Sequence, residues 1–252
     1  MCVSHVSRRT ALLGGAALLT SAAVAAPVHA APRHGVLDLT YPLGPSFPGF
    51  EPGEEAAVRT VKTIEDDGYY MQEWTVLEHI GTHVDAPAHF TTGGRVATDL
   101  RPAELITPAV VIDIAWKGPE GVVTVDDVKR FERRHGRIPD GAAVLMYSGW
   151  GARIGDGDAY RNGLIFPGFG VDACEWLLAR RRIRSLGVDT LSIDPGSSTT
   201  FDTHLALTGA DRYGIENLAN LDRLPPTGAR IFVGLIPYEN GSGGQARVLA
   251  TW

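Results

Sequence analysis

The chain has little cysteine and lacks several motifs that would place it in well-known enzyme classes. Its 252 residues contain two cysteines, Cys2 and Cys174. There is no Walker loop and no Gly-x-Ser-x-Gly nucleophile elbow, and Gly155-Asp-Gly157 lacks the third glycine of a dinucleotide-binding loop. These absences argue against P-loop nucleotide chemistry, serine α/β-hydrolase chemistry and Rossmann-type cofactor binding.

The first 30 residues have the pattern of an export signal. Arg8 and Arg9 precede an apolar run at 11–26, and Val28-His29-Ala30 forms a small-residue cleavage site. Paired arginines are typical of twin-arginine signals, which carry folded proteins across the bacterial membrane. A membrane anchor is the alternative, but the run is shorter than the about 20 apolar residues of a spanning helix. We therefore expect a signal peptide at 1–30, no stable membrane anchor, and a secreted or extracytoplasmic domain at 31–252.

Removal of this leader would change both the cysteine count and the net charge. Cys2 would leave with it, so Cys174 could form no internal disulfide and the hydrophobic core must supply the stability. Arg8 and Arg9 would leave without any acidic residue, so the net charge would go from −6 to −8. That balance disfavours nucleic acid or an anionic membrane as a partner. The remaining chain of about 220 residues is ample for one domain.

The pattern of apolar residues predicts a mixed α/β fold. Short β-branched runs bounded by Gly, Pro or Asp predict strands at 36–41, 70–78, 110–116, 143–148, 185–193, 231–236 and 247–252. Helices are predicted at 125–135, between a Thr124 cap and Gly136, at 171–182 and at 211–220. Strands and helices do not alternate strictly. We expect a single α/β domain with a mixed, partly barrel-like β-sheet flanked by helices.

The most informative segment reads His79-Ile-Gly-Thr-His83-Val-Asp85-Ala-Pro-Ala-His89. It holds three of the six histidines that follow the leader, together with an aspartate. Imidazole and carboxylate groups are the ligands of zinc-like and manganese-like divalent ions. Ordinary surface histidines on a strand and turn are the alternative, but so many polar groups are hard to place in a packed core without a metal.

The spacing of these residues predicts how the chain runs. The segment is not the helical His-Glu-x-x-His motif, because no glutamate follows His79 and both Gly81 and Pro87 weaken a helix. In a straight strand His79 and His83 would lie roughly 13 Å apart. A metal that binds both needs bonds of about 2.0–2.1 Å to each nitrogen. We therefore expect the chain to bend between them, at Gly81.

Two residues late in the chain are candidates for a second half of the site. His204 is the remaining site-like histidine, and Glu216 follows it after twelve residues. Neither is informative alone, since a glutamate within a helix is usually solvated. Their significance depends on the wider pattern.

That wider pattern resembles the metal-dependent cyclase family, which includes bacterial kynurenine formamidases and isatin hydrolases. The segment 79–89 matches the family signature, and further matches follow in the family's order over nearly the whole chain after the leader. They are Tyr147-Ser-Gly-Trp150, Gly187-Val-Asp-Thr-Leu-Ser-Ile-Asp-Pro195, His204 with Glu216-Asn-Leu-Ala-Asn-Leu, and Gly241-Ser-Gly-Gly-Gln-Ala-Arg247. The resemblance implies a swivelling β/β/α type of fold, one or two divalent ions (Zn²⁺ or Mn²⁺), and a homo-oligomer, either a dimer or a tetramer.

The resemblance also implies roles for individual residues. It gives five metal ligands: His79, His83, Asp85, His204 and Glu216. Asp85 and Glu216 would bridge two ions, and His204 would serve the second. His89 would be the general acid/base, which delivers a proton to the leaving nitrogen; a further ligand or a support for the ligands is the alternative. A bound ion would lower the pKa of water from 15.7 towards about 7 and polarise the carbonyl under attack.

One departure from the family concerns the substrate pocket. Kynurenine formamidases often show Pro-x-Trp-Pro-Gly-Asp near the N-terminus, where the tryptophan flanks an aromatic substrate. The corresponding segment here is Pro45-Ser-Phe47-Pro-Gly-Phe50. Because Phe47 keeps the aromatic ring, we expect it to contact a small-molecule substrate that contains a ring. Phe50 stands where those enzymes have an aspartate.

The leading hypothesis is an exported hydrolase that cleaves a C–N amide bond with metal-activated water. The bond would belong to a formamide or a cyclic amide. A cyclase or dehydratase of natural-product biosynthesis is one alternative, since it would use the same metal site. A non-catalytic exported protein that binds a metal or a small ligand is another, although such a protein would not need His89.

Overall fold

The computed structural model describes residues 35–252, so the predicted leader at 1–30 lies outside the described residues. The strands are β1 (Val36–Asp38), β2 (Ala57–Lys62), β3 (Met71–Thr75), β4 (His83–Asp85), β5 (Ile106–Asp113), β6 (Val122–Val123), β7 (Ala143–Tyr147), β8 (Gly168–Phe169), β9 (Ser185–Val188), β10 (Tyr213–Glu216), β11 (Ala229–Leu235) and β12 (Gly243–Thr251). The helices are α1 (Ile64–Asp67), α2 (Val125–His135), α3 (Gly157–Arg161), α4 (Val171–Arg181) and α5 (Asp202–Gly209). Short 3-10 turns include η1 (Pro87–His89) and η3 (Pro102–Glu104).

Seven strands close into a ring of mixed parallel and antiparallel pairs. Their order is β12-β11-β5-β7-β9-β10-β4, and β4 then pairs with β12 again. The pairs among β5, β7, β9 and β10 are parallel, and the others in the ring are antiparallel. β1 adds to the sheet beside β12. The expectation of one α/β domain with a mixed, barrel-like sheet flanked by helices is confirmed.

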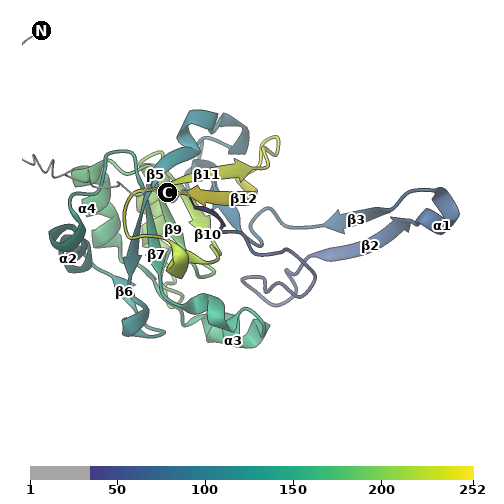
Figure 1. The fold of residues 1–252 in the computed structure, drawn as a ribbon, viewed down its shortest axis with the longest axis horizontal. Coiled ribbons are helices and arrows are strands. Elements are labelled where there is room, and N and C mark those ends of the chain that lie inside the picture. The colour runs from purple at the N-terminus through teal and green to yellow at the C-terminus, as the bar shows by residue number, and fades with distance from the viewer. Residues whose placement is uncertain (1–34) are drawn as a thin grey trace, which may run out of the picture. The chain divides into compact units, whose positions relative to one another are not determined.

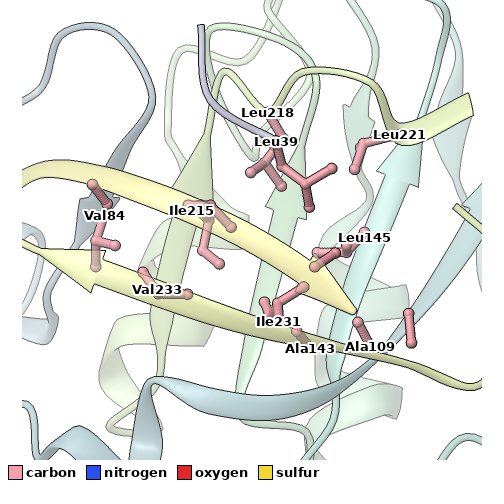
Figure 2. Packing of buried hydrophobic residues seen from close by; sticks show 14 of the residues in the cluster. Leu39, Val84, Ala109, Ala143, Leu145, Ile215, Leu218, Leu221, Ile231 and Val233 are labelled. Atoms are coloured by element: carbon pink, nitrogen blue, oxygen red, sulfur yellow. The ribbon is translucent and has the colours of Figure 1, made fainter. Parts of the chain in front are cut away.

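Alternating side chains of the strands fill two separate cores. In β7, Ala143 and Leu145 belong to the core inside the ring, while Val144 and Met146 belong to the core between the sheet and the helices. Figure 2 shows Leu145 within the inner core, together with Ile231 of β11. The outer core includes side chains of α2 and α4, which lie beside each other on one side of the sheet (Figure 1). Strands covered on both faces are apolar throughout, which is why they stand out in the sequence.

Helix α2 begins and ends where its sequence predicts. The Thr124 hydroxyl accepts a hydrogen bond from the backbone N–H of Asp127, and the Asp127 carboxylate accepts one from the N–H of Thr124 at 2.8 Å. Gly136 ends the helix with φ +91°, a conformation that favours glycine. The helix predicted at 171–182 is also present, as α4, and ends at Arg181.

The helix predicted at 211–220 is wrong, because this segment contains the buried strand β10. β10 lies between β9 and β4, and Tyr213 and Ile215 enter the inner core. A Cβ atom on Gly214 would lie 2.8 Å from a carboxylate oxygen of Asp85. A glycine is therefore needed here because the two strands pack closely. The apolar pattern also does not predict α5, β2 or the three-residue strand β4.

β2 and β3 form a two-stranded hairpin with α1 at its tip. It extends away from the ring of strands (Figure 1), and every residue of β3 is exposed. We call this hairpin, residues 57–75, the arm. No helix among residues 35–252 is long and apolar enough to cross a membrane.

A buried carboxylate ties the segment that follows the histidine cluster to the sheet. Glu104, which is 5% exposed, accepts hydrogen bonds from Arg95 and Arg184 at 2.9 Å each and from Arg101 at 3.1 Å. Burial acts to raise the pKa of Glu104, but hydrogen bonds from Arg101 and Arg95 outweigh it and lower the pKa to about 2. Glu104 therefore joins three segments through charge-assisted hydrogen bonds.

We predict that Glu104→Gln reduces the free energy of unfolding by about 2–3 kcal/mol at pH 7, on the order of the pKa shift. The folded-state pKa lies below the unfolded one, so this stabilisation is present above about pH 5 and is lost as the pH falls towards 2. Urea unfolding at several pH values should show the difference from wild type shrinking below pH 4. Glu73→Gln, in the exposed pair with Arg59, should cost less than about 1 kcal/mol; equal losses would contradict the role of Glu104.

Candidate metal centre and active site

The histidine motif is a bent loop that leads into β4. The bend predicted at Gly81 is confirmed, since this residue has φ +71°. His83 and Asp85 are the first and last residues of β4, so they share one face of the strand while Val84 enters the inner core. His79 precedes the bend and returns to the same place, with its Nδ1 atom 2.7 Å from Asp85 Oδ1.

Strand pairing and helix α5 bring in the two late residues. In the β10–β4 pair, Glu216 stands opposite His83 and Gly214 opposite Asp85. His204 lies in the first turn of α5. Its Nε2 atom is 3.2 Å from Glu216 Oε1 and 3.6 Å from Asp85 Oδ2. On the other side, His83 Nε2 is 3.2 Å from Asp85 Oδ1 and 3.4 Å from Glu216 Oε2.

The structure thus brings together all five residues for which the sequence predicts a metal-binding role. Four of them are at most 5% exposed, and the side chain of His79 is 21% exposed. Two overlapping groups could each hold a metal ion, because their donor atoms lie within 4.8 Å of one another. One consists of His79, His83 and Asp85, and the other of Asp85, His89 and His204.

The hydrogen bonds around the cluster leave acceptor atoms facing one another. His83 Nδ1 must donate to the carbonyl oxygen of Gly81 at 2.9 Å, because a carbonyl cannot donate. His83 Nε2 then points at two carboxylates, and neither it nor Asp85 Oδ2 has a hydrogen-bond partner among the described residues. A buried polar atom without a partner costs about 1–3 kcal/mol. A divalent cation at the centre would satisfy both atoms, so the donor set fits a metal.

The charges of the cluster favour the same occupant. Burial acts to lower the pKa of His83, but Asp85 and Glu216 outweigh it and raise the pKa to about 9. Burial and the neighbouring Asp85 raise the pKa of Glu216, while the surrounding histidines hold the pKa of Asp85 well below its usual range against the effect of burial. The cluster therefore gathers positive charge, either as protons or as a metal ion that displaces them.

His89 differs from the other histidines of the cluster. It ends the 3-10 turn η1 and stacks on His79, with ring centroids 3.7 Å apart. Burial lowers the pKa of His89 to about 4, so its imidazole is neutral at pH 7 and able to accept a proton.

Asp194 orients His204, and sequence reasoning gave it no role. This buried carboxylate accepts a hydrogen bond from His204 Nδ1 at 2.6 Å, and it also accepts from the backbone N–H groups of Thr203 and His204. It therefore caps the start of α5 and leaves His204 Nε2 facing the cluster. Asp194 is part of a matched sequence motif, but only the fold shows its contact with His204.

A cavity of about 400 Å³ opens above the cluster. Its lining includes five apolar side chains, namely Phe50, Leu77, Phe90, Leu191 and Phe201, which we call its wall. The other lining residues are His79, His83, His89, His204 and Glu216 of the cluster, together with Glu54, Glu78 and Ser192. Phe90 and Phe201 contact each other with ring centroids 5.3 Å apart. The structure places Phe50 in this wall, whereas Phe47 is 5% exposed and packs against Tyr41 and Tyr160.

Comparisons with known proteins agree with this architecture. The family model described as "Putative cyclase" matches residues 37–195. The chain belongs to the cyclase family. An isatin hydrolase from Roseibium aggregatum is 35% identical over 85% of this chain and 90% of its own length. A kynurenine formamidase from Sphingopyxis alaskensis is 29% identical over 76% of this chain and 85% of its own length.

Solved structures show the same fold. Isatin hydrolase A from Ralstonia solanacearum superposes with a TM-score of 0.82 at 37% identity, covering 86% of this chain and 92% of its own. An isatin hydrolase bound to the product analogue thioisatinate gives a TM-score of 0.82 at 30% identity, over 87% of this chain and 92% of its own. The cyclase-family chain is thus an enzyme, a hydrolase of C–N bonds other than peptide bonds. Its His/Asp cluster suggests a divalent metal.

We predict that removal of the metal destabilises the folded protein. The cluster joins β4, β10 and α5, so a bound ion would cross-link them and stabilise the folded state by mass action. Chelation should lower the melting temperature, and added Zn²⁺ or Mn²⁺ should restore it. An unchanged melting curve, after elemental analysis confirms that no metal remains, would argue against a metal at this cluster.

Proposed function

We propose that this enzyme opens the C–N bond of a neutral, planar cyclic aromatic amide, of the isatin type, by hydrolysis. The observation that carries the proposal is a cavity that is lined both by the histidine and carboxylate cluster and by three phenylalanines. Its three phenylalanines offer flat faces to a ring, and the cluster lies where the amide carbonyl would enter.

The charges of the cavity favour this substrate over formylkynurenine. Among the described residues that line it, none is Lys or Arg, and Glu54 and Glu78 add negative charge that disfavours a substrate carboxylate. An isatin-type lactam carries no charge, whereas formylkynurenine has an amino-acid end with a carboxylate and an ammonium group. Phe50 also replaces the aspartate that kynurenine formamidases often have. A substrate carboxylate placed against these rings would lose hydration without gaining a Lys or Arg partner.

We assign the metal ligands to the five converging side chains: His79, His83, Asp85, His204 and Glu216. Asp85 contacts three of the histidines and Glu216 contacts two, which suits both carboxylates to a bridging position. The proposal includes one or two ions, Zn²⁺ or Mn²⁺, which match this mixed set of nitrogen and oxygen donors. When bound, such an ion supplies a water of lowered pKa and polarises the substrate carbonyl.

The proposed role of His89 is proton transfer. Its neutral imidazole would accept a proton from the attacking water as the new C–O bond forms, and would return it to the amide nitrogen as the C–N bond breaks. The products would be a carboxylate and a free aromatic amine. The stacking contact with His79 holds the His89 ring at the edge of the cluster, beside the cavity.

The proposal also covers export and self-association. Export, to a secreted or extracytoplasmic location, rests on the twin-arginine pattern at 8–9, and the N-terminal sequence of the secreted protein would check it.

Self-association rests on the arm, where Ile64, Tyr70 and Trp74 are 66%, 58% and 41% exposed. A two-stranded hairpin is marginally stable alone in water, so a second copy of the chain that covers these side chains would stabilise it. Light scattering would measure the assembly.

The substrate assignment predicts a preference that one substitution should change. Isatin should be hydrolysed with a kcat/KM at least about 10-fold above that for N-formylkynurenine. Phe50→Asp should lower kcat/KM for isatin by about 10-fold or more and reduce the preference, because it places a charge in the apolar wall. Phe50→Leu, which keeps the wall apolar, should change the preference less. A wild-type enzyme that prefers N-formylkynurenine would overturn the assignment.

The role of His89 predicts that two inactive variants differ in metal content. His89→Ala should keep its metal, because the five assigned ligands remain, and should lose activity by roughly 10²–10⁴-fold. Asp85→Ala should lose metal and activity together, since it removes a carboxylate that contacts three histidines. Elemental analysis and kcat measured on the same samples separate the two. Loss of metal from His89→Ala would make His89 a ligand, and full activity would assign the proton transfer to another group.

A further inference from the structure

The glycine-rich segment 241–245 is a matched sequence motif with no part in the proposed chemistry. It runs beside the loop that carries His79, and Gly243 stands opposite Asp85 in the β12–β4 pair. A Cβ atom on Gly243 would lie 2.5 Å from Cε1 of His79 and 2.3 Å from the carbonyl oxygen of Val84. Glycine at this position therefore lets the last strand of the ring approach the imidazole closely.

Two side chains connect this segment to His79. His79 Nε2 lies 2.8 Å from the hydroxyl of Ser242, and that hydroxyl donates to Glu78 Oε1 at 2.8 Å. Glu78 Oε2 also accepts the backbone N–H of Gly243 at 3.3 Å. The contact is thus a chain of hydrogen bonds from an imidazole through a hydroxyl to a carboxylate.

The direction of these bonds fixes the proton of His79. A carboxylate has no hydrogen to donate, so the single hydrogen of Ser242 must point to Glu78. The Ser242 oxygen can then only accept, and His79 Nε2 must carry a hydrogen. In a neutral imidazole this leaves the lone pair on Nδ1, which is the atom that lies 2.7 Å from Asp85 Oδ1.

We propose that Ser242 and Glu78 are positioning residues that hold His79 as the Nε2–H tautomer and present its Nδ1 atom for metal binding. This inference rests on the proposed metal site. The two other ligand histidines are held in the same manner, His83 by the Gly81 carbonyl and His204 by Asp194. A carboxylate partner also makes an imidazole a stronger ligand, and loss of such a partner typically lowers metal affinity 10–100-fold.

Ser242→Ala tests the proposal through metal binding. Mn²⁺ titrations of the full chain should give a dissociation constant about 10–100-fold higher than that of wild type. Glu78→Gln, which keeps an acceptor for the hydroxyl, should weaken binding less than Ser242→Ala does. Ser185→Ala is the matched control, because it removes a buried hydroxyl of β9 that has no hydrogen-bond partner within residues 35–252. Its Mn²⁺ affinity should equal that of wild type.

A spectroscopic measurement separates positioning from a loss of folding. In the Zn²⁺-loaded wild type and in Ser185→Ala, imidazole ¹⁵N–¹H spectra should show a slowly exchanging proton on Nε2 of His79. Ser242→Ala should lose this slow exchange while keeping the other histidine signals. Wild-type affinity and a retained slow proton in Ser242→Ala would overturn the positioning role. Failure of wild type itself to bind Mn²⁺ or Zn²⁺ would instead overturn the proposed metal site.

Discussion

The pairing of β4 with both β10 and β12 is the constraint on which the site depends. This three-residue strand closes the ring, and its outer residues are His83 and Asp85. Val84, fully buried between them, sets the register, because a slip of one residue would turn both polar side chains into the inner core. Closure of the barrel and assembly of the cluster are therefore the same event. The hydrogen bonds between segment 241–245 and His79 depend on the same closure, because the β12–β4 pairing brings this segment beside the histidine loop.

Electrostatics explains why such a cluster needs an occupant. Asp85 and Glu216 are buried side by side, and burying unpaired carboxylates is costly. The neighbouring histidines reduce the cost by taking up protons, and the pKa of His83 is raised for this reason. A divalent ion performs the same task with more charge, because it binds the imidazole lone pairs in place of protons. The strands β4 and β10, which carry the two buried carboxylates, are thus the part of the ring whose stability depends most on a bound cation.

Local signals in the sequence predict local structure well and non-local structure poorly. The Thr124 cap and Gly136 define α2, and the density of ligands together with Gly81 predicts a bent metal-binding loop. The helix predicted over β10 is wrong because a four-residue strand that contains a glycine is too short to show a clear hydrophobic periodicity. Its strand conformation comes from pairing with β9 and β4. His204 and Glu216 gain meaning only from the family resemblance, since they lie far from β4 in sequence.

The residues of the cluster and the residues of the cavity wall lie on different kinds of segment. His83, Asp85 and Glu216 lie on strands whose register is fixed by the core, whereas Phe50, Phe90 and Phe201 lie on segments outside the strands and helices. A substitution in the wall changes what the cavity accepts without changing any hydrogen bond of the cluster. Phe50 is such a position: it forms an edge-to-face contact with Phe166 at 6.4 Å, and its apolar ring offers no hydrogen bond to the proposed ligands. Under the proposed function, the wall rather than the cluster would therefore decide between a charged formamide and a neutral lactam.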